Sequence, residues 1–104
     1  MTSAAASTAI NQLLLTACVA ELGVLRFTPA GLPAIDLRLE HESTLDEAGK
    51  SRQVKTVLKA VAFGAVAERL ARQTMGSHWC FRGFLATPGN AKHPVMNIQD
   101  FQQD

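Results

Sequence analysis

The sequence contains no tyrosine, one tryptophan and only two cysteines in 104 residues. Cys18 and Cys80 lie far apart and form no Cys-x-x-Cys pair or histidine cluster, so neither a zinc site nor a disulfide framework is indicated. The formal net charge is only +1, and bulk charge therefore gives no reason to expect a nucleic-acid or membrane partner. We interpret the cysteines as buried free thiols, and any argument for a charged ligand has to rest on where the charges lie.

Long apolar segments and targeting signals are also missing. Residues 1–9 are small and polar, carry no basic side chain and precede no long apolar stretch, which excludes a signal peptide or membrane span there. We expect them to be a disordered leader in a cytoplasmic protein. The remaining residues, 10–104, are expected to form a single domain, because the chain is 47% apolar and has room for one core.

Catalytic signatures are absent as well. The sequence has no Gly-x-Ser-x-Gly, no glycine-rich phosphate loop and no His-Glu-x-x-His. Glu40, His41 and Glu42 are adjacent, but successive strand residues point to opposite faces, so the histidine is separated from both carboxylates. We therefore expect no catalytic residues, no metal ion and no cofactor, and predict that the protein is not an enzyme.

Charge is distributed unevenly along the chain. Residues 50–92 carry eight basic side chains against the single acid Glu68, whereas residues 36–47 carry five acidic side chains against the single base Arg38. The folded molecule is therefore expected to have an asymmetric surface charge, with its positive side built mainly from the second half of the chain.

Alternation of apolar and polar residues predicts strands in the first half of the chain. Residues 34–42 alternate with the period of a half-buried strand. Residues 10–27 are predicted to form one long strand bent near Gly23, followed by a hairpin turn around residues 30–31. Residues 43–51 are polar and without periodicity, and are predicted to form a mobile loop.

The second half is predicted to contain a strand, a short helix ending near Gly76, and two more strands, at residues 52–62, 63–73, 78–86 and 95–101. This order, with the helix between the third and fourth strands, predicts an all-β fold, the five-stranded Greek-key oligonucleotide-binding (OB) barrel. An SH3-like barrel or a small sandwich is an alternative, because the order of strands along a chain does not establish how they pair.

Basic side chains on these elements are candidates for binding nucleic acid. Lys55 and Lys59 are four residues apart on one strand, which places them on one face about 13 Å apart. Further basic residues lie on the first hairpin, on the second and fourth strands, in the loop at 43–51 and in the last loop, and extend this predicted DNA-binding track: Arg26, Arg38, Lys50, Arg52, Arg82 and Lys92. Exposed lysines on strands also serve solubility and edge protection, and spacing alone does not separate the two interpretations.

Aromatic side chains for stacking on bases are few. Trp79 and Phe81 alternate with polar neighbours and are expected in the core, so Phe27 and Phe84 are the better candidates for exposed rings. Electrostatic contacts should then dominate binding, which predicts a modest affinity that falls steeply with salt.

Several short motifs occur together between Asn11 and the C-terminal segment. They are Asn11-x-Leu13-x-Leu15, Pro29-x-Gly31-x-Pro33, Leu39-Glu40-His41, Glu47-Ala48-Gly49, Arg52-Gln53 and Gly83-Phe84. In this order and spacing the chain resembles the primosomal replication protein N (PriB) family, small restart proteins related to single-stranded-DNA-binding proteins. The resemblance implies an OB fold assembled as a homodimer that binds single-stranded DNA. It also implies that such a protein helps the PriA helicase and DnaT reload the replicative helicase at stalled forks.

The resemblance extends to some candidate site residues and fails at others. Arg26, Arg52 and Lys92 match positions where the family carries cations near DNA. Family members can place aromatic residues where this chain has Lys50 and Lys55, and a basic residue where it has Glu42. Base stacking is therefore expected to contribute less here.

Two functions from different classes are compatible with these sequence features. The first is a non-enzymatic accessory protein that binds single-stranded DNA. The second is a protein-interaction adaptor that binds a helicase or another replication subunit with only incidental DNA contact, and the acidic residues between Glu42 and Glu47 favour it. A small hydrolase is a weak third. A homodimer is expected in addition, because the long first strand offers an edge for pairing with a second copy.

Overall fold

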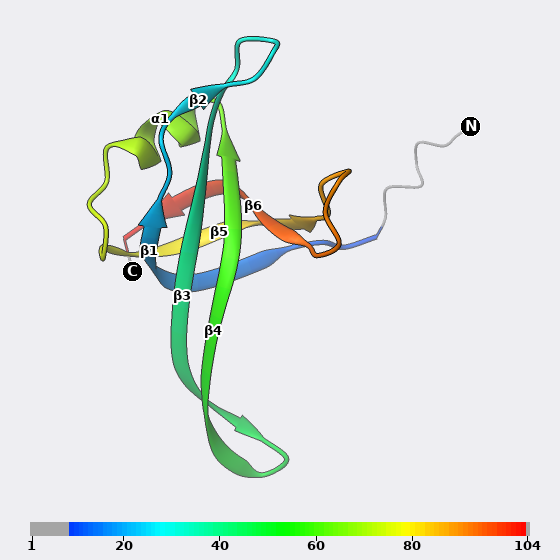
Figure 1. Ribbon diagram of the computed structural model, residues 1–104. Coiled ribbons are helices and arrows are strands. Elements are labelled where there is room, and N and C mark those ends of the chain that lie inside the picture. Colours follow the sequence, from blue (N-terminus) through cyan, green and yellow to red (C-terminus); the bar gives the residue numbers. More distant parts are fainter. Residues whose placement is uncertain (1–8, 104) are drawn as a thin grey trace.

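Six strands and one short helix follow one another along residues 9–103, the part of the chain that the computed structural model describes (Figure 1). The elements are β1 (Leu13–Leu22), β2 (Arg26–Phe27), β3 (Pro33–Glu47), β4 (Lys50–Phe63), α1 (Ala65–Ala71), β5 (His78–Ala86) and β6 (Val95–Gln102). The leader predicted at residues 1–9 lies, apart from Ala9, outside the described residues and stays a prediction. No helix within the described residues is long and apolar enough to cross a membrane.

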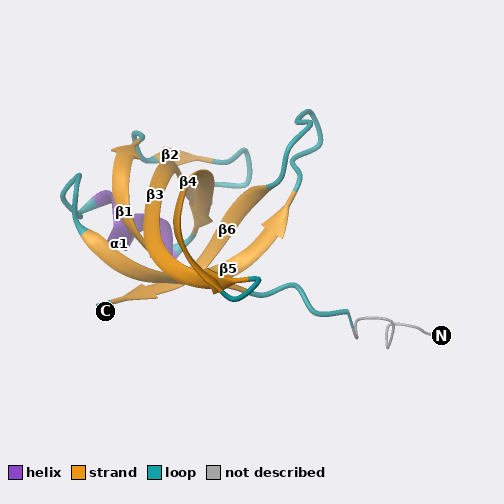
Figure 2. Cartoon of the chain, turned by 90° about the horizontal axis from the view of Figure 1, so that it is seen from below, coloured by secondary structure: helices purple, strands orange, loops and turns teal. Residues whose placement is uncertain are grey.

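The strands pair into a closed ring. β1 is antiparallel to both β3 and β5, β5 is antiparallel to β6, β6 is parallel to β4, and β4 is antiparallel to β3. Figure 2 views this ring from below. With β1 and β2 taken together as the first strand and α1 placed between the third and fourth, the pairing is that of the predicted OB fold.

The core fills the inside of the ring. Ile35, Leu37 and Leu39 of β3 point inward and are at most 5% exposed, as their alternation predicts. Phe81 of β5 joins them, and Leu70 of α1 packs into the same cluster, so the helix covers one end of the barrel. Burial of these apolar surfaces is the main stabilising contribution to the fold.

The predicted mobile loop at residues 43–51 is wrong. β3 and β4 stay paired from Ala34↔Phe63 to Glu47↔Lys50 and form a long hairpin that extends well beyond the rest of the barrel (Figure 1). Ala48 and Gly49 form its two-residue turn with φ values of 53° and 81°, a conformation that suits the twist of paired strands. Residues 44–53 are exposed on both faces, so no apolar alternation marks them as strand. We call residues 41–56 the arm and the rest of the barrel the body.

The predicted single strand at residues 10–27 is also divided. It breaks at Gly23 into β1 and β2, and the Gly23 N–H donates to the carbonyl oxygen of Asp36 at 2.8 Å. A Cβ at this position would lie 2.8 Å from that oxygen, so only glycine fits against β3. The bend was predicted at the right residue, but the backbone leaves the β1–β3 ladder there instead of continuing it.

Several smaller predictions meet the structure with mixed results. The turn at residues 28–32 is confirmed, with the Gly31 N–H donating to the Thr28 carbonyl at 2.8 Å. Phe81 is buried and Trp79 half-buried, as expected for the core. Cys18 and Cys80 are free thiols, but both are half-buried instead of fully buried, because they lie on the outer side of their strands.

Candidate nucleic-acid interface

The outer face of β4 carries a row of side chains at every second position. Because β4 alternates, its inward residues Ala60 and Ala62 are buried and the odd-numbered residues face outward. The outward row consists of Lys55, Val57, Lys59, Val61 and Phe63, and of these only Val61 is buried. Lys59 lies directly opposite Arg38 of β3, so the two predicted cations share this face.

Three hollows adjoin one another along this face. The first is lined by Glu21, Asp36, Arg38, Lys59 and Val95 among others, and the second by Val57, Lys59, Lys92, His93 and Val95. The third is lined by Arg26, Asp36, Phe63, Pro88, Val95 and Asn97 among others. We call the three together the outer groove. The groove runs between the β3–β4 face and the loop that joins β5 to β6, with Val95 common to all three hollows.

Four of the predicted DNA-binding residues, Arg26, Arg38, Lys59 and Lys92, therefore line one continuous surface although they come from different segments. Arg26 belongs to β2 and Lys92 to the loop at residues 87–94. Within residues 9–103, neither Lys59 nor Lys92 has an acidic partner within 4.0 Å.

Both arginines of the groove are held by carboxylates. The Arg26 guanidinium donates to both oxygens of Asp36, at 3.0 Å and 3.3 Å, and this hydrogen-bonded pairing raises the pKa of Arg26. Arg38 donates to Glu21 at 2.9 Å across the β1–β3 ladder. All four side chains are about half exposed or more, so water and ions reach both pairs.

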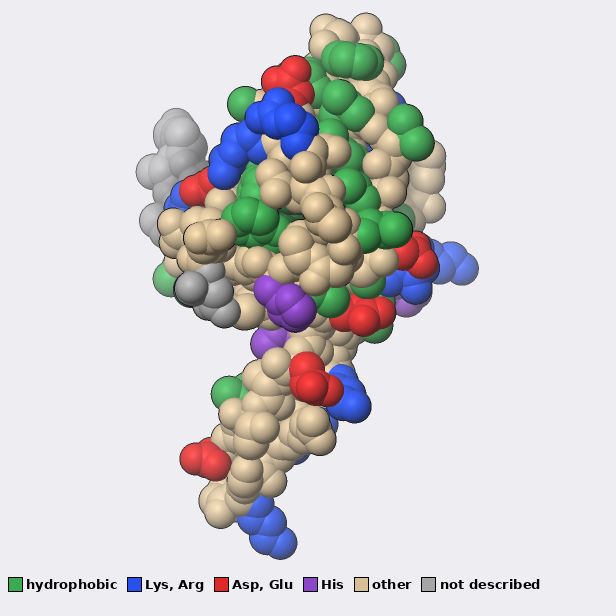
Figure 3. Space-filling model, turned by 90° about the vertical axis from the view of Figure 1, so that its left-hand side faces the viewer, with side chains coloured by type: hydrophobic (Ala, Val, Ile, Leu, Met, Phe, Trp, Pro, Cys, Tyr) green, Lys and Arg blue, Asp and Glu red, His purple; other side chains and the backbone are tan. Residues whose placement is uncertain are grey.

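The cations of the arm divide between its two faces. Lys55 continues the outward row of β4 and its ammonium lies 3.3 Å from Glu42. Arg52 donates to Glu47, and the register of β3 and β4 places both Arg52 and Lys50 on the other face. Figure 3 accordingly shows basic and acidic side chains close together along the arm. Lys55 thus lies on the same outward row of β4 as Lys59, beyond the three hollows, whereas Lys50 and Arg52 lie on the other face.

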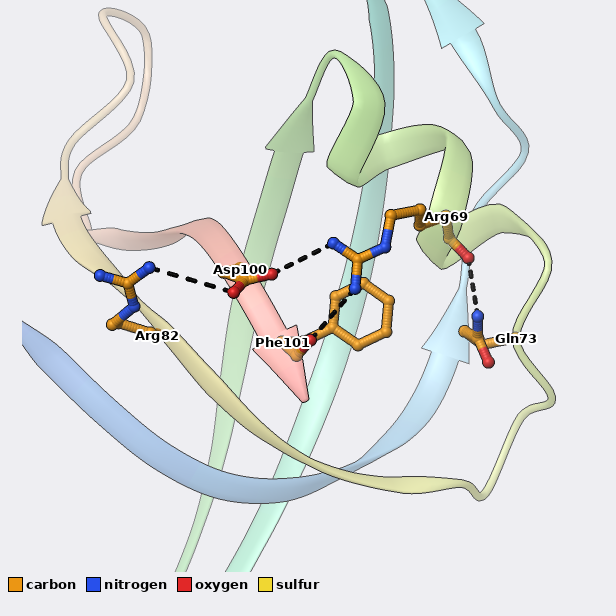
Figure 4. A network of polar contacts seen from close by, with 5 residues as sticks. All are labelled: Arg69, Gln73, Arg82, Asp100 and Phe101. Atoms are coloured by element: carbon orange, nitrogen blue, oxygen red, sulfur yellow. Dashed lines mark hydrogen bonds and ion pairs between the residues drawn. The ribbon is translucent and has the colours of Figure 1, made fainter. Parts of the chain in front are cut away.

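Arg82 lies elsewhere, on the outside of β5, and takes part in a polar network with β6 and α1 (Figure 4). Its guanidinium is 4.0 Å from Asp100, which also accepts from Arg69 at 3.1 Å. Arg69 further donates to the Phe101 carbonyl at 3.2 Å and lies 4.4 Å over the Phe101 ring. The hydrogen bond from Arg69, the backbone N–H of Phe101 and the nearby guanidiniums together lower the pKa of Asp100. This network ties α1 to the barrel and lies outside the outer groove.

The aromatic candidates are placed differently from one another. Phe27 is 64% exposed on β2, and Phe84 is half-buried on β5. Sequence reasoning missed Phe63, which is 43% exposed beside Arg26 in the groove. The signal was present, because Phe63 continues the period of two that joins Lys55 to Lys59. It was overlooked because the predicted helix began at that residue, whereas α1 begins at Ala65.

The chain is similar to proteins of known name and structure. A family described as "another single-strand binding protein family" matches residues 11–100. Replication restart protein PriB of Bordetella pertussis is 48% identical over 77 residues, covering 74% of this chain and 72% of that protein. PriB of Nitrosomonas europaea is 31% identical over 91 residues, covering 86% of this chain and 84% of that protein.

Solved structures agree with these sequence matches. The structure of PriB from Ralstonia solanacearum at 1.8 Å superposes with a TM-score of 0.84 at 35% identity, covering 91% of this chain and 98% of that one. The wild-type single-stranded DNA binding protein from Thermus aquaticus superposes with a TM-score of 0.72 at 22% identity, covering 89% of this chain and 49% of that one. The second likeness shows the fold alone.

Proposed function

This chain belongs to a single-strand binding protein family and to the PriB family of replication restart proteins, and from that premise we propose that it binds single-stranded DNA in the outer groove. The observation that carries the proposal is the meeting of Arg26, Arg38, Lys59 and Lys92 on one surface. OB folds bind oligonucleotides on the face of their second and third strands and in the loops beside it. In this chain those strands are β3 and β4.

The chemistry of the groove suits a phosphate backbone more than base recognition. Lysine and arginine side chains neutralise phosphates without regard to sequence. Phe63 and Phe27 offer exposed rings at the Arg26 end, on which a base can stack. At the opposite end of the row, Lys55 lies beyond Lys59 and would lead a strand of DNA from the body onto the arm. Binding is therefore expected to be independent of sequence and sensitive to salt.

The wider role proposed is that of an accessory protein of the replication-restart primosome, helping to reload the replicative helicase at stalled forks. Its support is the name shared by the relatives, replication restart protein PriB. The PriA helicase and DnaT are the proposed partners. A system with purified forms of both, in which helicase loading on a forked DNA requires this chain, tests the role, and loading that proceeds equally well without it contradicts the proposal.

A homodimer is proposed as the assembled form. Residues 13–17 of β1 pair with β5 on one edge, and within the described residues their other edge has no strand partner. Leu14 is 68% exposed on the same stretch. An unpaired edge beside an exposed apolar side chain suits pairing with a second copy. Light scattering that gives the mass of one chain at all concentrations contradicts this assembly.

The alternative function, an adaptor with incidental DNA contact, is supported by the acidic side chains on the arm. Glu42, Asp46 and Glu47 are exposed there, and phosphate groups are repelled by carboxylates. Capture of the restart helicase on immobilised protein, repeated with Asp46→Lys and Glu47→Lys, distinguishes the two functions. Loss of helicase capture with unchanged DNA affinity favours the adaptor.

Fluorescence anisotropy with a labelled thymidine oligonucleotide tests DNA binding directly. Lys59→Ala should weaken binding about fivefold at low salt and reduce the slope of log affinity against log salt by about 0.7, the value for one lost phosphate contact on a single strand. Arg72→Ala is the matched control, since Arg72 is an exposed cation outside the groove. The groove assignment fails if both variants bind equally well. The binding function fails if the wild-type protein does not bind even at low salt.

A further inference from the structure

The outer groove contains acidic side chains beside its basic ones. Glu21 and Asp36 line the same hollow as Arg38 and Lys59, and each holds an arginine. Asp36 binds Arg26 through two hydrogen bonds in a fork, the geometry with which a guanidinium also binds a phosphate. Asp36 therefore occupies the fork of Arg26 with which this guanidinium could bind a phosphate, and Glu21 occupies one N–H group of Arg38.

The same arrangement is repeated on the arm. Lys55 is paired with Glu42 and Arg52 with Glu47. Five of the eight predicted DNA-binding cations are thus paired with a carboxylate from a neighbouring strand: Arg26, Arg38, Arg52, Lys55 and, outside the groove and the arm, Arg82. The two groove lysines are not, within the described residues.

We propose that Glu21 and Asp36 compete with DNA phosphates for Arg38 and Arg26, and so set both the affinity and the salt response of the groove. The inference rests on the proposed binding of single-stranded DNA and adds to it the residues that limit it. The two carboxylate side chains are 64% and 63% exposed, so each pair opens into water and exchanges partners readily. Free lysines make the first contacts with DNA, and the arginines follow by exchange.

Competition of this kind has a signature in the ions released on binding. A phosphate that takes an arginine releases its own counterion, but the displaced carboxylate then attracts a cation from solution. The release of one cation and the uptake of another offset each other. The affinity of the wild-type protein should therefore fall less steeply with salt than its number of phosphate contacts implies. Neutralising the carboxylate removes the uptake, which steepens the salt dependence and tightens binding at low salt.

A purely structural role for these pairs predicts a different result. Glu21 and Arg38 lie opposite each other in the β1–β3 ladder, and the Arg26–Asp36 pair joins β2 to β3. If the carboxylates only held the arginines in place for DNA, their removal would leave affinity unchanged or lower it. The direction of the change therefore separates the two roles.

The experiment measures binding of a labelled thymidine oligonucleotide to full-length Glu21→Gln and Asp36→Asn across a range of salt. Each variant should bind about fivefold more tightly than wild type at low salt, with a steeper slope. Glu68→Gln is the control, because it makes the same change in charge on α1, outside the three hollows. The control should bind less than twofold more tightly, as expected for a charge that acts only at a distance.

A second background identifies the arginine concerned. In an Arg38→Gln protein, Glu21→Gln should improve affinity no more than Glu68→Gln does, since the residue for which Glu21 competes is gone. The inference is overturned if Glu21→Gln still improves affinity fivefold in the Arg38→Gln protein. It is also overturned if Glu21→Gln and Asp36→Asn bind DNA no more tightly than Glu68→Gln. Either result leaves the proposed DNA binding intact. If none of these proteins binds DNA at low salt, the proposed function itself fails.

Discussion

The body and the arm share the strands β3 and β4 but are stabilised by different interactions. In the body, β3 contributes Ile35, Leu37 and Leu39 to a core in which they are at most 5% exposed. In the arm, β3 and β4 remain paired, yet residues 44–53 are all exposed. The comparison shows that backbone pairing continues where apolar burial has ended, so the free energy of unfolding should depend on the body.

The arm is correspondingly free to serve a ligand. Within residues 9–103 its edges have no strand partner, because β1 pairs with β3 only as far as Glu40 and β6 pairs with β4 only at residues 60–62. Charged side chains occupy both faces, which opposes edge-to-edge aggregation while keeping the surface available. The body thus carries both the core and the outer groove, whereas the arm adds exposed, charged surface without adding to the core.

The largest expected difference is between apolar side chains in the two regions. Phe81→Ala removes a fully buried ring that stacks on Phe101, and should cost about 3–5 kcal/mol of unfolding free energy. Leu45→Ala in the arm removes a side chain that is 56% exposed, and should cost less than about 0.5 kcal/mol. Urea unfolding followed by circular dichroism measures both. Equal losses in the two variants would break the comparison.

Shortening the arm should have a smaller effect than Phe81→Ala, and it should change DNA affinity more than the free energy of unfolding. Replacing residues 44–53 by an Asn-Gly turn joins Ser43 to Val54, a pair in phase with the Glu47↔Lys50 pair that closes the present turn, in a two-residue hairpin. The free energy of unfolding should stay within about 1 kcal/mol of wild type, because no core residue is lost. Affinity for a thymidine oligonucleotide should fall about fivefold if DNA also reaches the cations of the arm.

The matched control for the shortened arm is the full-length double variant Lys50→Ala, Arg52→Ala. It removes the same two cations and keeps the length of the hairpin. If the control reproduces the loss of affinity, the charges of the arm are responsible. If the shortened protein unfolds as easily as Phe81→Ala, the arm supports the body and the division between the regions is wrong.

The smallest effect is expected from an exposed ion pair of the body, at Asp100. Its pKa is lowered by the hydrogen bond from Arg69, so the ionised carboxylate adds stability above its ordinary pKa of 3.8. That stability is lost as pH falls through the lowered value. Asp100→Asn should therefore lower the urea midpoint slightly at about pH 7, and the difference from wild type should shrink at about pH 3. A difference that stays constant between the two pH values would contradict this assignment.

Much of the body was predictable from the sequence, because burial on one face leaves a periodic pattern. The alternation that marks Leu37 and Leu39 as inward also places Lys55 and Lys59 on the outer face. The arm was not predictable in this way. Its polar residues 44–53 have no buried face, and the turn at Ala48 lacks the asparagine or aspartate that usually marks such hairpins.

The composition of the outer groove was harder to predict than its strands. Lys92 lies in a loop, so periodicity does not place it, and its position beside Lys59 follows from the pairing of β6 with β4. The contact between Glu21 and Arg38 depends on an irregular step in the β1–β3 ladder between Val19 and Glu21. Arg82 was assigned to the DNA track by its charge, but the partner that occupies it, Asp100, is known only once β5 and β6 are paired.

The ring has one short parallel joint. Among the described residues β4 and β6 share three residue pairs, whereas β3 and β4 share fourteen and β1 and β5 share six. Separating β4 from β6 breaks fewer residue pairs than separating any other two neighbouring strands of the ring, so the barrel should open first between them. Lys59 on β4 and Lys92 just before β6 lie on either side of this short pairing. A polyanion that binds both should therefore oppose the separation of β4 from β6 and stabilise the folded barrel.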